Sequence, residues 1–210
     1  MFRFRARALA VFFALASVAA AAALPITTEA RASVSIAVTF DGLVRETSLS
    51  AVVTPIEQRA AWENGRIYTY TRVSVDRVVA GATSASGTPP QTEAWVRTMG
   101  GIVGKIGQVV DGEAVLTIGR PSLLFLHAGP PGTLEVTARG QGQFPIVVDD
   151  KKSTRVIRAS NVGALLAARP GSTTSTTIAP PLAADVIHGR LLDDVARDVA
   201  TAFKRLHATK

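Results

Sequence analysis

The segment from Arg66 to Gly81, RIYTYTRVSVDRVVAG, alternates between two kinds of side chain. Its odd-numbered positions from 67 to 75 carry only isoleucine, threonine and valine. Its even-numbered positions carry larger or polar side chains, which are Tyr68, Tyr70, Arg72, Ser74 and Asp76. A period of two is that of a β-strand, and β-branched residues fit a half-buried pleated surface. The segment therefore predicts a strand with one buried and one exposed face, and hence a fold built on a sheet.

Shorter strand patterns lie on both sides of this segment. The run 122–127, SLLFLH, is apolar almost throughout, which predicts a strand covered on both faces. The other strand patterns occupy 48–55, 93–98, 133–139, 143–148 and 154–158. About seven short strands with turn signals between them are typical of an all-β sandwich or small barrel. We therefore expect a mainly β domain over 33–169, a small antiparallel barrel or sandwich of OB-like size, followed by a C-terminal amphipathic helix.

The region between the first two long strands has a less regular pattern. Pro55 is expected to end the first of them. The next residues, 56–65, are expected to form a turn of helix or a loop that ends at Asn64-Gly65, a pair that favours tight turns. A short helix is predicted earlier in the chain, at 40–47.

The glycine-rich stretch 97–112, RTMGGIVGKIGQVVDG, contains a Gly-Lys pair like that of a phosphate-binding loop. A P-loop has four residues between its first glycine and this pair, and a hydroxyl residue after the lysine. Here Gly100 lies one residue too close to Gly104, and Ile106 occupies the hydroxyl position. No helix pattern follows, as a dinucleotide-binding fold would require. We expect the glycines to serve bends or bulges of the backbone, and we expect no cofactor.

The N-terminal residues have the three parts of a secretory signal peptide. Three arginines within 3–7 precede an apolar run over 8–24, and ARA at 30–32 supplies a cleavage pattern. The run is shorter than the roughly 20 residues of a spanning helix, so cleavage is favoured over an uncleaved anchor. We expect residues 1–32 to be a signal peptide, and the mature protein to be secreted or periplasmic with no membrane span. Since the chain has no cysteine, its core must hold without disulfides.

The C-terminal part of the chain differs in character. Residues 170–181, PGSTTSTTIAPP, lack apolar periodicity and predict a linker. In 182–210, apolar residues recur at helical spacing, at Leu182, Val186, Leu191, Val195, Val199, Phe203 and Leu206. We predict an amphipathic helix with a weak point at Gly189. Its apolar stripe would dock on the barrel or on a second copy of the chain, which would make the protein a homo-oligomer.

The chemistry-bearing residues form no recognisable catalytic or metal-binding motif. The histidines His127, His188 and His207 fall in different predicted elements, and the sequence contains no H-E-x-x-H. Ser122 opens the predicted buried strand, and there is no G-x-S-x-G motif. We name no catalytic, metal-binding or cofactor-binding residue and expect a non-enzymatic protein. A hydrolase with an unrecognised site remains the alternative.

One predicted surface suggests binding. The outward faces of strands 66–81 and 93–98 carry Tyr68, Tyr70, Arg72, Trp95 and Arg97. If these strands are neighbours, the face suits stacking and charge contacts with carbohydrate, peptide or nucleic acid. Nucleic acid is the least favoured, because without residues 1–32 the chain has 19 basic against 15 acidic residues, dispersed along it. The face could instead be covered by a second subunit or by the C-terminal helix, and cover by the helix is the interpretation we favour.

Residues 40–148 resemble a group of uncharacterised exported bacterial β-barrel proteins. The shared pattern places glycines after one strand, as a pair after another, before a Leu-Phe-Leu strand and before the last strand. These places are filled by Gly81, Gly100-Gly101, Gly119 with 124–126, and Gly140 with Gly142. The resemblance implies a compact barrel and export, but no site. Netrin-like inhibitors share a barrel of this size but depend on an N-terminal cysteine and disulfides, so their function is not implied here.

From these observations we expect an exported, non-enzymatic binding or envelope-associated module. Its partner would be a protein or a carbohydrate of the cell envelope. A self-associating structural protein is a further alternative, since the apolar stripe of the C-terminal helix could join two copies.

Overall fold

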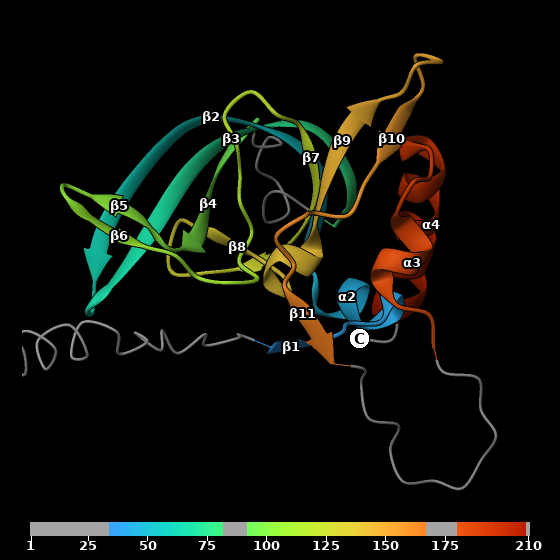
Figure 1. Ribbon diagram of the computed structural model, residues 1–210. Coiled ribbons are helices and arrows are strands. Elements are labelled where there is room, and N and C mark those ends of the chain that lie inside the picture. Colours follow the sequence, from blue (N-terminus) through green and yellow to red (C-terminus); the bar gives the residue numbers. More distant parts are fainter. Residues whose placement is uncertain (1–33, 82–91, 167–179, 209–210) are drawn as a thin grey trace, which may run out of the picture. The chain divides into compact units, whose positions relative to one another are not determined.

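Five strands of the computed structural model close into a small barrel (Figure 1). They are β2 (Leu49–Glu63), β3 (Arg66–Gly81), β4 (Glu93–Met99), β7 (Ser122–Ala128) and β8 (Leu134–Val136). β2, β3, β4 and β8 pair in that order, and β7 closes the ring by pairing with both β8 and β2. The structure describes residues 34–81, 92–166 and 180–208. The predicted signal peptide and most of the predicted linker lie outside this part of the chain.

The order of the barrel strands is that of an OB-fold. The first barrel strand along the chain pairs with the second and the fourth, and the third pairs with the fifth. That last pair, β4 with β8, is parallel, and Val96 lies opposite Leu134 in its register. The other barrel pairs are antiparallel. The mainly β, OB-like fold is thus confirmed, with one parallel pair in place of a wholly antiparallel barrel.

The remaining elements extend or flank this barrel. β9 (Gln143–Val148) and β10 (Thr154–Val156) continue the sheet beyond β7. β5 (Gly101–Val103) and β6 (Ile106–Gln108) form a separate hairpin, and β1 (Val34–Ile36) pairs in parallel with β11 (Ala164–Leu166). The helical elements are α2 (Phe40–Glu46), a 3₁₀ turn η1 (Arg139–Gly142), α3 (Ala183–Ile187) and α4 (Leu192–His207).

β2 continues through Pro55, so the predicted end at this residue and the predicted loop or helical turn over 56–65 are both wrong. The register of β2 with β7 stops at Val53, so the proline interrupts no hydrogen bond of that ladder. On the β3 side, an irregular register between Pro55 and Glu57 accommodates it as a bulge. The tight turn expected at the end of this region is present. Asn64 and Gly65, with φ of 51° and 77°, connect β2 to β3 as a hairpin turn.

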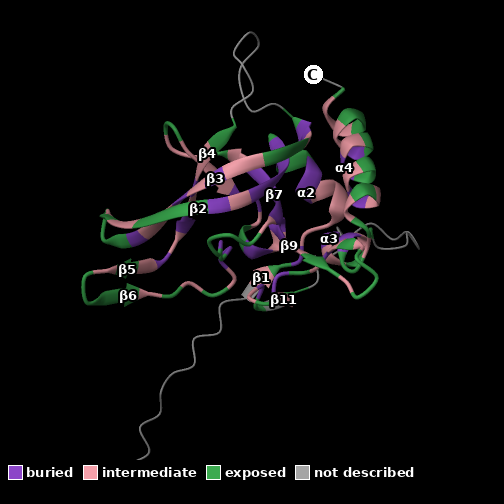
Figure 2. Cartoon of the chain, turned by 90° about the horizontal axis from the view of Figure 1, so that it is seen from above, coloured by how far each residue is buried: buried purple, intermediate pink, exposed green. Residues whose placement is uncertain are grey.

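β7 is buried along most of its length (Figure 2) and lies between two apolar cores, as its apolar sequence predicts. Leu124 and Leu126 belong to the core inside the barrel, together with residues of β2, β3, β4 and β8. Leu123 and Phe125 belong to a second core outside the barrel, where the ring of Phe125 meets that of Phe144 edge-on at 5.9 Å between centroids. The helices cover this second core.

The C-terminal segment forms two helices, because Gly189, with φ of 77°, separates α3 from α4. The buried residues of α4, Val195, Val199 and Ala202, pack into the second core on the outer side of β2 and β7. The expectation that this helix covers the predicted binding face is therefore wrong, because its apolar stripe packs elsewhere. Among the described residues, no helix is long and apolar enough to cross a membrane.

Candidate functional site

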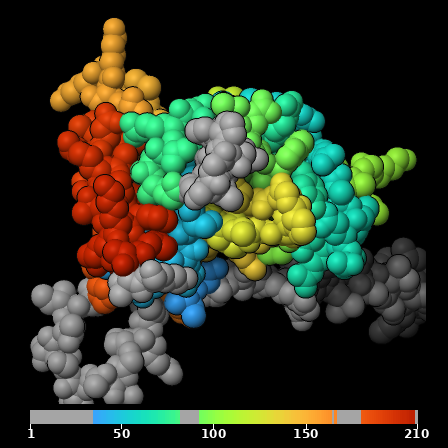
Figure 3. Space-filling view, turned by 180° about the vertical axis from the view of Figure 1, so that it is seen from behind, coloured from blue at the N-terminus to red at the C-terminus, as the bar shows by residue number. Residues whose placement is uncertain are grey.

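The outward sides of β2, β3 and β4 form one continuous surface. In the β3–β4 register, Arg72 lies opposite Trp95 and Tyr70 lies opposite Arg97. All five residues predicted for the binding face are thus brought together on neighbouring strands. In Figure 3, which shows the molecule from behind, α4 (red) lies at one side of the surface formed by β3 and β8 (green and yellow). We call this surface the aromatic face and define it by Glu57, Arg59, Glu63, Tyr68, Tyr70, Arg72, Glu93, Trp95, Arg97 and Glu135.

The alternation of β3 and β4 explains why these side chains point outward. Their neighbours in sequence, Thr71, Val73 and Val96, are fully buried inside the barrel. Because successive side chains of a strand point to opposite faces, burial of one set places the aromatic and charged set outside. The core of the barrel therefore fixes the orientation of the face.

Arg59 belongs to this surface, although the sequence pattern predicted a loop or helical turn at this position. It pairs with Tyr70 across β2 and β3. Its guanidinium carbon lies 5.7 Å from the ring centroid of Tyr70 and 4.7 Å from that of Trp95. Both distances are within the range of cation–π attraction. The charged residues at 57, 59 and 63 keep a period of two, and this was the signal that could have revealed the strand.

Arg97 is the best-connected cation of the face, and its side chain is only 16% exposed. It donates to Glu135 Oε1 at 2.5 and 2.8 Å and to Glu63 Oε2 at 3.0 Å. Its guanidinium also lies 4.3 Å from the ring centroid of Tyr68. Desolvation acts to lower the pKa of Arg97, but its bonds to Glu135 and Tyr70 outweigh this and raise it. The group is therefore a permanent cation held in place by two carboxylates.

Tyr70 and Arg72 complete the polar network. The Tyr70 hydroxyl donates to Glu63, and this hydrogen bond raises the pKa of the tyrosine. Arg72 contacts Glu93 at 2.9 Å and Glu57 at 2.8 Å, and these two bonds raise the pKa of its guanidinium. The face thus holds three arginines and four glutamates. Two of its three cations, Arg72 and Arg97, are already paired with neighbouring carboxylates.

A pocket of about 180 Å³ opens beside Tyr68 and Arg97, and both Glu113 and Glu135 line it. Glu113 is only 7% exposed. Its Oε1 accepts from the backbone N–H of Ala114 at 3.2 Å, and its Oε2 lies 3.9 Å from Arg139 Nε. Burial raises the pKa of this carboxyl. Two carboxyl groups, one buried and one bonded to arginine, therefore border a pocket at the edge of the aromatic face.

The residues considered for hydrolysis are not arranged as a reactive site. Ser122 is 4% exposed and begins β7, whereas His127 lies near its other end. His127 Nδ1 lies 3.2 Å from Thr137 Oγ1, and its Nε2 lies 3.6 Å from Glu135 Oε2. This hydroxyl, imidazole and carboxylate match a triad only in composition, because Thr137 is 2% exposed and a nucleophile needs access to its substrate. In the described part of the chain, no cluster of potential ligands could hold a metal ion.

The glycine-rich stretch forms the end of β4 and the β5–β6 hairpin. Gly101 has a φ of 131°, and a Cβ there would lie 2.4 Å from Thr69 Oγ1. At Gly100, where φ is 97°, a Cβ would lie 2.8 Å from the carbonyl oxygen of Gln108. These two glycines are thus required by backbone conformation and by close packing, of Gly101 on β3 and of Gly100 on β6, as their position within a strand pattern predicts.

Comparison with protein-family models, with curated proteins and with solved structures gives no match for this chain. The resemblance to exported β-barrel proteins therefore stays a prediction.

Proposed function

We propose that the protein is an exported, non-enzymatic binding module that recognises an envelope carbohydrate through its aromatic face. Export to the periplasm or the medium is inferred from the signal-peptide pattern in residues 1–32. The observation that carries the binding proposal is the convergence of three aromatic rings and three arginines on β2, β3 and β4.

The position of this face supports the proposal. β3 and β4 are the second and third strands of the barrel along the chain. In OB-folds the surface of these two strands is the usual place where oligosaccharides and oligonucleotides bind. Tyr68, Tyr70 and Trp95 offer flat apolar rings, and the surrounding carboxylates and guanidinium groups offer acceptors and donors for hydroxyl groups.

The charges of the face favour an uncharged ligand over nucleic acid. A polyanion binds by neutralising its phosphates with free lysines and arginines. Here Arg72 and Arg97 are each bonded to two glutamates. Four carboxylates would repel a phosphate backbone, whereas sugar hydroxyls can donate to them.

Strand pairing argues against an extended peptide as the ligand. A peptide that binds by strand addition needs an unpaired edge. β3 is paired with β2 and β4, and β4 is paired with β3 and β8. A ligand of this face must therefore lie across the side chains, as a chain of sugar rings does when it stacks on aromatic residues.

The experiment uses the two tryptophans of the chain, Trp62 and Trp95. The exported protein carrying Trp62→Phe has Trp95 as its single tryptophan fluorophore, at the centre of the face. Titration with N-acetylglucosamine oligosaccharides and with soluble peptidoglycan fragments should change its emission saturably. Arg59→Ala in the same background should weaken the response, because Arg59 fixes the ring of Trp95.

A matched pair of tryptophan variants controls this test in a sedimentation assay with purified peptidoglycan. Trp95→Ala should abolish binding. Trp62→Ala should keep it, since Trp62 is 48% exposed and lies outside the face. Equal binding by the two variants, or no response to any glycan, would contradict the proposal. Release of shortened glycans on incubation would instead favour the hydrolase alternative.

Self-association through the C-terminal helix is the weaker alternative. The apolar residues of α4 pack against the second core of their own chain. A dimer through this helix would have to use its polar side, which includes Asp194 and Arg197 in an ion pair with each other.

A further inference from the structure

A second concave site lies away from the aromatic face. A cleft of about 540 Å³ is formed by segment 115–122, by β9 and by segment 157–161. Its volume is in the range of small-ligand pockets. None of the ten residues that define the aromatic face lines it.

The charged side chains that line this cleft are all positive. Arg120 and Arg158 line it, and no aspartate or glutamate does. Eight arginines of the described chain lie in ion pairs with carboxylates, and Arg45, Arg59 and Arg66 do not but lie outside the cleft; the paired ones are Arg72, Arg77, Arg97, Arg139, Arg155, Arg190, Arg197 and Arg205. Arg120 and Arg158 have no such pair with a described residue. Two guanidinium groups that line one cleft without a carboxylate partner favour the binding of an anion there.

The cleft also holds neutral donors and a fixed wall. The hydroxyl groups of Thr117 and Ser160 line it beside the arginines. The amide of Gln143 is bonded to both backbone groups of Val115, at 2.9 and 2.6 Å, and so braces one wall. The backbone N–H of Arg158 donates to His188 Nδ1 at 3.0 Å, which anchors the other wall to the end of α3.

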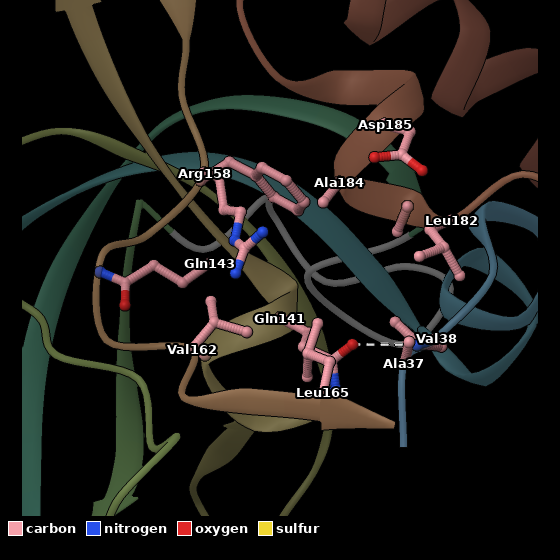
Figure 4. Close-up of a pocket in the computed structure, with 13 residues that line it drawn as sticks. Ala37, Val38, Gln141, Gln143, Arg158, Val162, Leu165, Leu182, Ala184 and Asp185 are labelled. Atoms are coloured by element: carbon pink, nitrogen blue, oxygen red, sulfur yellow. Dashed lines mark hydrogen bonds between the residues drawn. The ribbon is translucent and has the colours of Figure 1, made fainter. Parts of the chain in front are cut away.

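Arg158 lines both this cleft and a smaller pocket of about 40 Å³, which is drawn in Figure 4. The smaller pocket is largely apolar, with Val38, Val162, Leu165 and Leu182 around it. Figure 4 shows the side chain of Arg158 directed into the space between Gln143 and Val162.

We propose that the cleft binds a phosphate group, carried by a small phosphorylated molecule or by a lipid headgroup, between Arg120 and Arg158. A phosphate fits better than a carboxylate. It offers three or four oxygens and up to two negative charges, and two guanidinium forks with two hydroxyl groups can satisfy them together. The proposal is independent of the glycan site, because the two surfaces share no residue.

Isothermal titration of the exported protein with inorganic phosphate and with glycerol 3-phosphate tests the soluble source. Co-sedimentation with phosphatidylglycerol vesicles, against phosphatidylcholine vesicles as reference, tests the lipid source. Saturable binding in either arm supports the site and identifies the source. Arg120→Gln and Arg158→Gln should each weaken binding by about tenfold or more, as expected when one charge-assisted contact is lost.

Arg45→Gln is the matched control, because Arg45 is an exposed arginine of α2 outside the cleft. It should bind like the wild type. Circular dichroism and the Tm of each variant establish that it is folded, and both cleft arginines are exposed, so their replacement should leave the core intact. Absence of saturable binding in both arms would overturn the proposal. So would binding that the two cleft variants leave unchanged.

Discussion

The guanidinium of Arg59 lies 4.7 Å from the ring centroid of Trp95, although the two residues belong to strands that are not paired with each other. β3 runs between their strands and contributes Tyr70, which Arg59 also contacts. Three strands are thus joined on their outer side by one cation and two rings. The contact makes Arg59 part of the proposed ligand face.

Arg59→Ala should lower the free energy of unfolding by about 1 kcal/mol, since two partly exposed cation–π contacts are lost. In the Trp62→Phe background, Arg59→Ala should also shift the emission of Trp95, because the indole ring loses its contact with the guanidinium. Urea unfolding followed by fluorescence measures both effects. Arg66→Ala, an exposed arginine at the start of β3, should change neither quantity. An equal effect of the two substitutions would refute the role of Arg59.

Arg97→Ala should destabilise the fold by about 2 kcal/mol, because Glu63 and Glu135 would be left close together without their shared cation. The figure is below that of a fully buried pair because these glutamates remain about a third exposed. Adding Glu135→Gln should recover part of the loss, as a double-mutant cycle by urea unfolding would show. Arg72→Ala should have little effect on Tm, since that arginine is solvent-exposed. If Arg97→Ala proved as mild as Arg72→Ala, the network would contribute no stability.

Glu113 should make stability depend on pH. Its pKa is raised above the ordinary 4.5 by burial, so the folded chain holds this proton more tightly than the unfolded chain. Its contribution to stability is complete below pH 4.5 and is lost as the pH rises through the raised value. Glu113→Gln should therefore match the wild type near pH 4 and have a higher Tm than the wild type at pH 7. Calorimetry between pH 4 and pH 7 measures the Tm of the variant and of the wild type, and Glu46→Gln, at an exposed position, is the control. A lower Tm of Glu113→Gln at pH 7 would contradict the sign.

Two glycines of the same stretch should differ in their tolerance of alanine. Gly101→Ala combines a positive φ with a Cβ placed 2.4 Å from Thr69 Oγ1, and should cost about 3 kcal/mol. Gly104 has a φ of 61° with open space around it, so Gly104→Ala should cost only about 1 kcal/mol. Thermal unfolding of the two variants compares them. Equal losses would mean that crowding at Gly101 is relieved by movement of the hairpin.

Val199→Asp should unfold the protein or lower its stability by more than about 3 kcal/mol, because it buries a charge in the second core. The control is Lys204→Ala, an exposed position of the same helix.

Deletion of residues 182–210 should likewise cause aggregation, since it uncovers Leu123 and Phe125. A truncated chain that stayed soluble with an unchanged Tm would show that the helices are dispensable.

The sequence predicted the faces of β3 and β4 because both strands strictly alternate. It failed for the second half of β2, where Pro55 and the alanines 60 and 61 conceal the same period. The proline is tolerated only because the pairing with β7 ends at Val53, and no local pattern reveals where a neighbouring strand stops. Arg59 and Glu63 were missed for this reason.

The placement of the C-terminal helix depends on contacts that sequence spacing does not specify. The apolar run of β7 indicated that both sides of this strand are covered, and both are. It did not indicate which element covers the outer side. The apolar stripe on α4 would fit any apolar surface. Only the structure shows that it packs on the outer side of β7 and not on the aromatic face. The sequence also did not predict Glu135 as a residue of the face, because it is the parallel pairing of β8 with β4 that brings Glu135 beside Arg97.

The pairing of β8 with β4 and β7 has a consequence for the order in which the molecule can be assembled. β2, β3 and β4 form a local meander that can pair as soon as residue 99 is available. Their inner face stays open until β7 and the three residues of β8 arrive, so ring closure depends on contacts distant in sequence, which form slowly. A chain that emerges with its N-terminus first would pass through a half-open intermediate with Val53, Val73 and Val96 in water. Such an intermediate would be a substrate for chaperones, and its lifetime, more than the final stability, would limit the yield of folded protein.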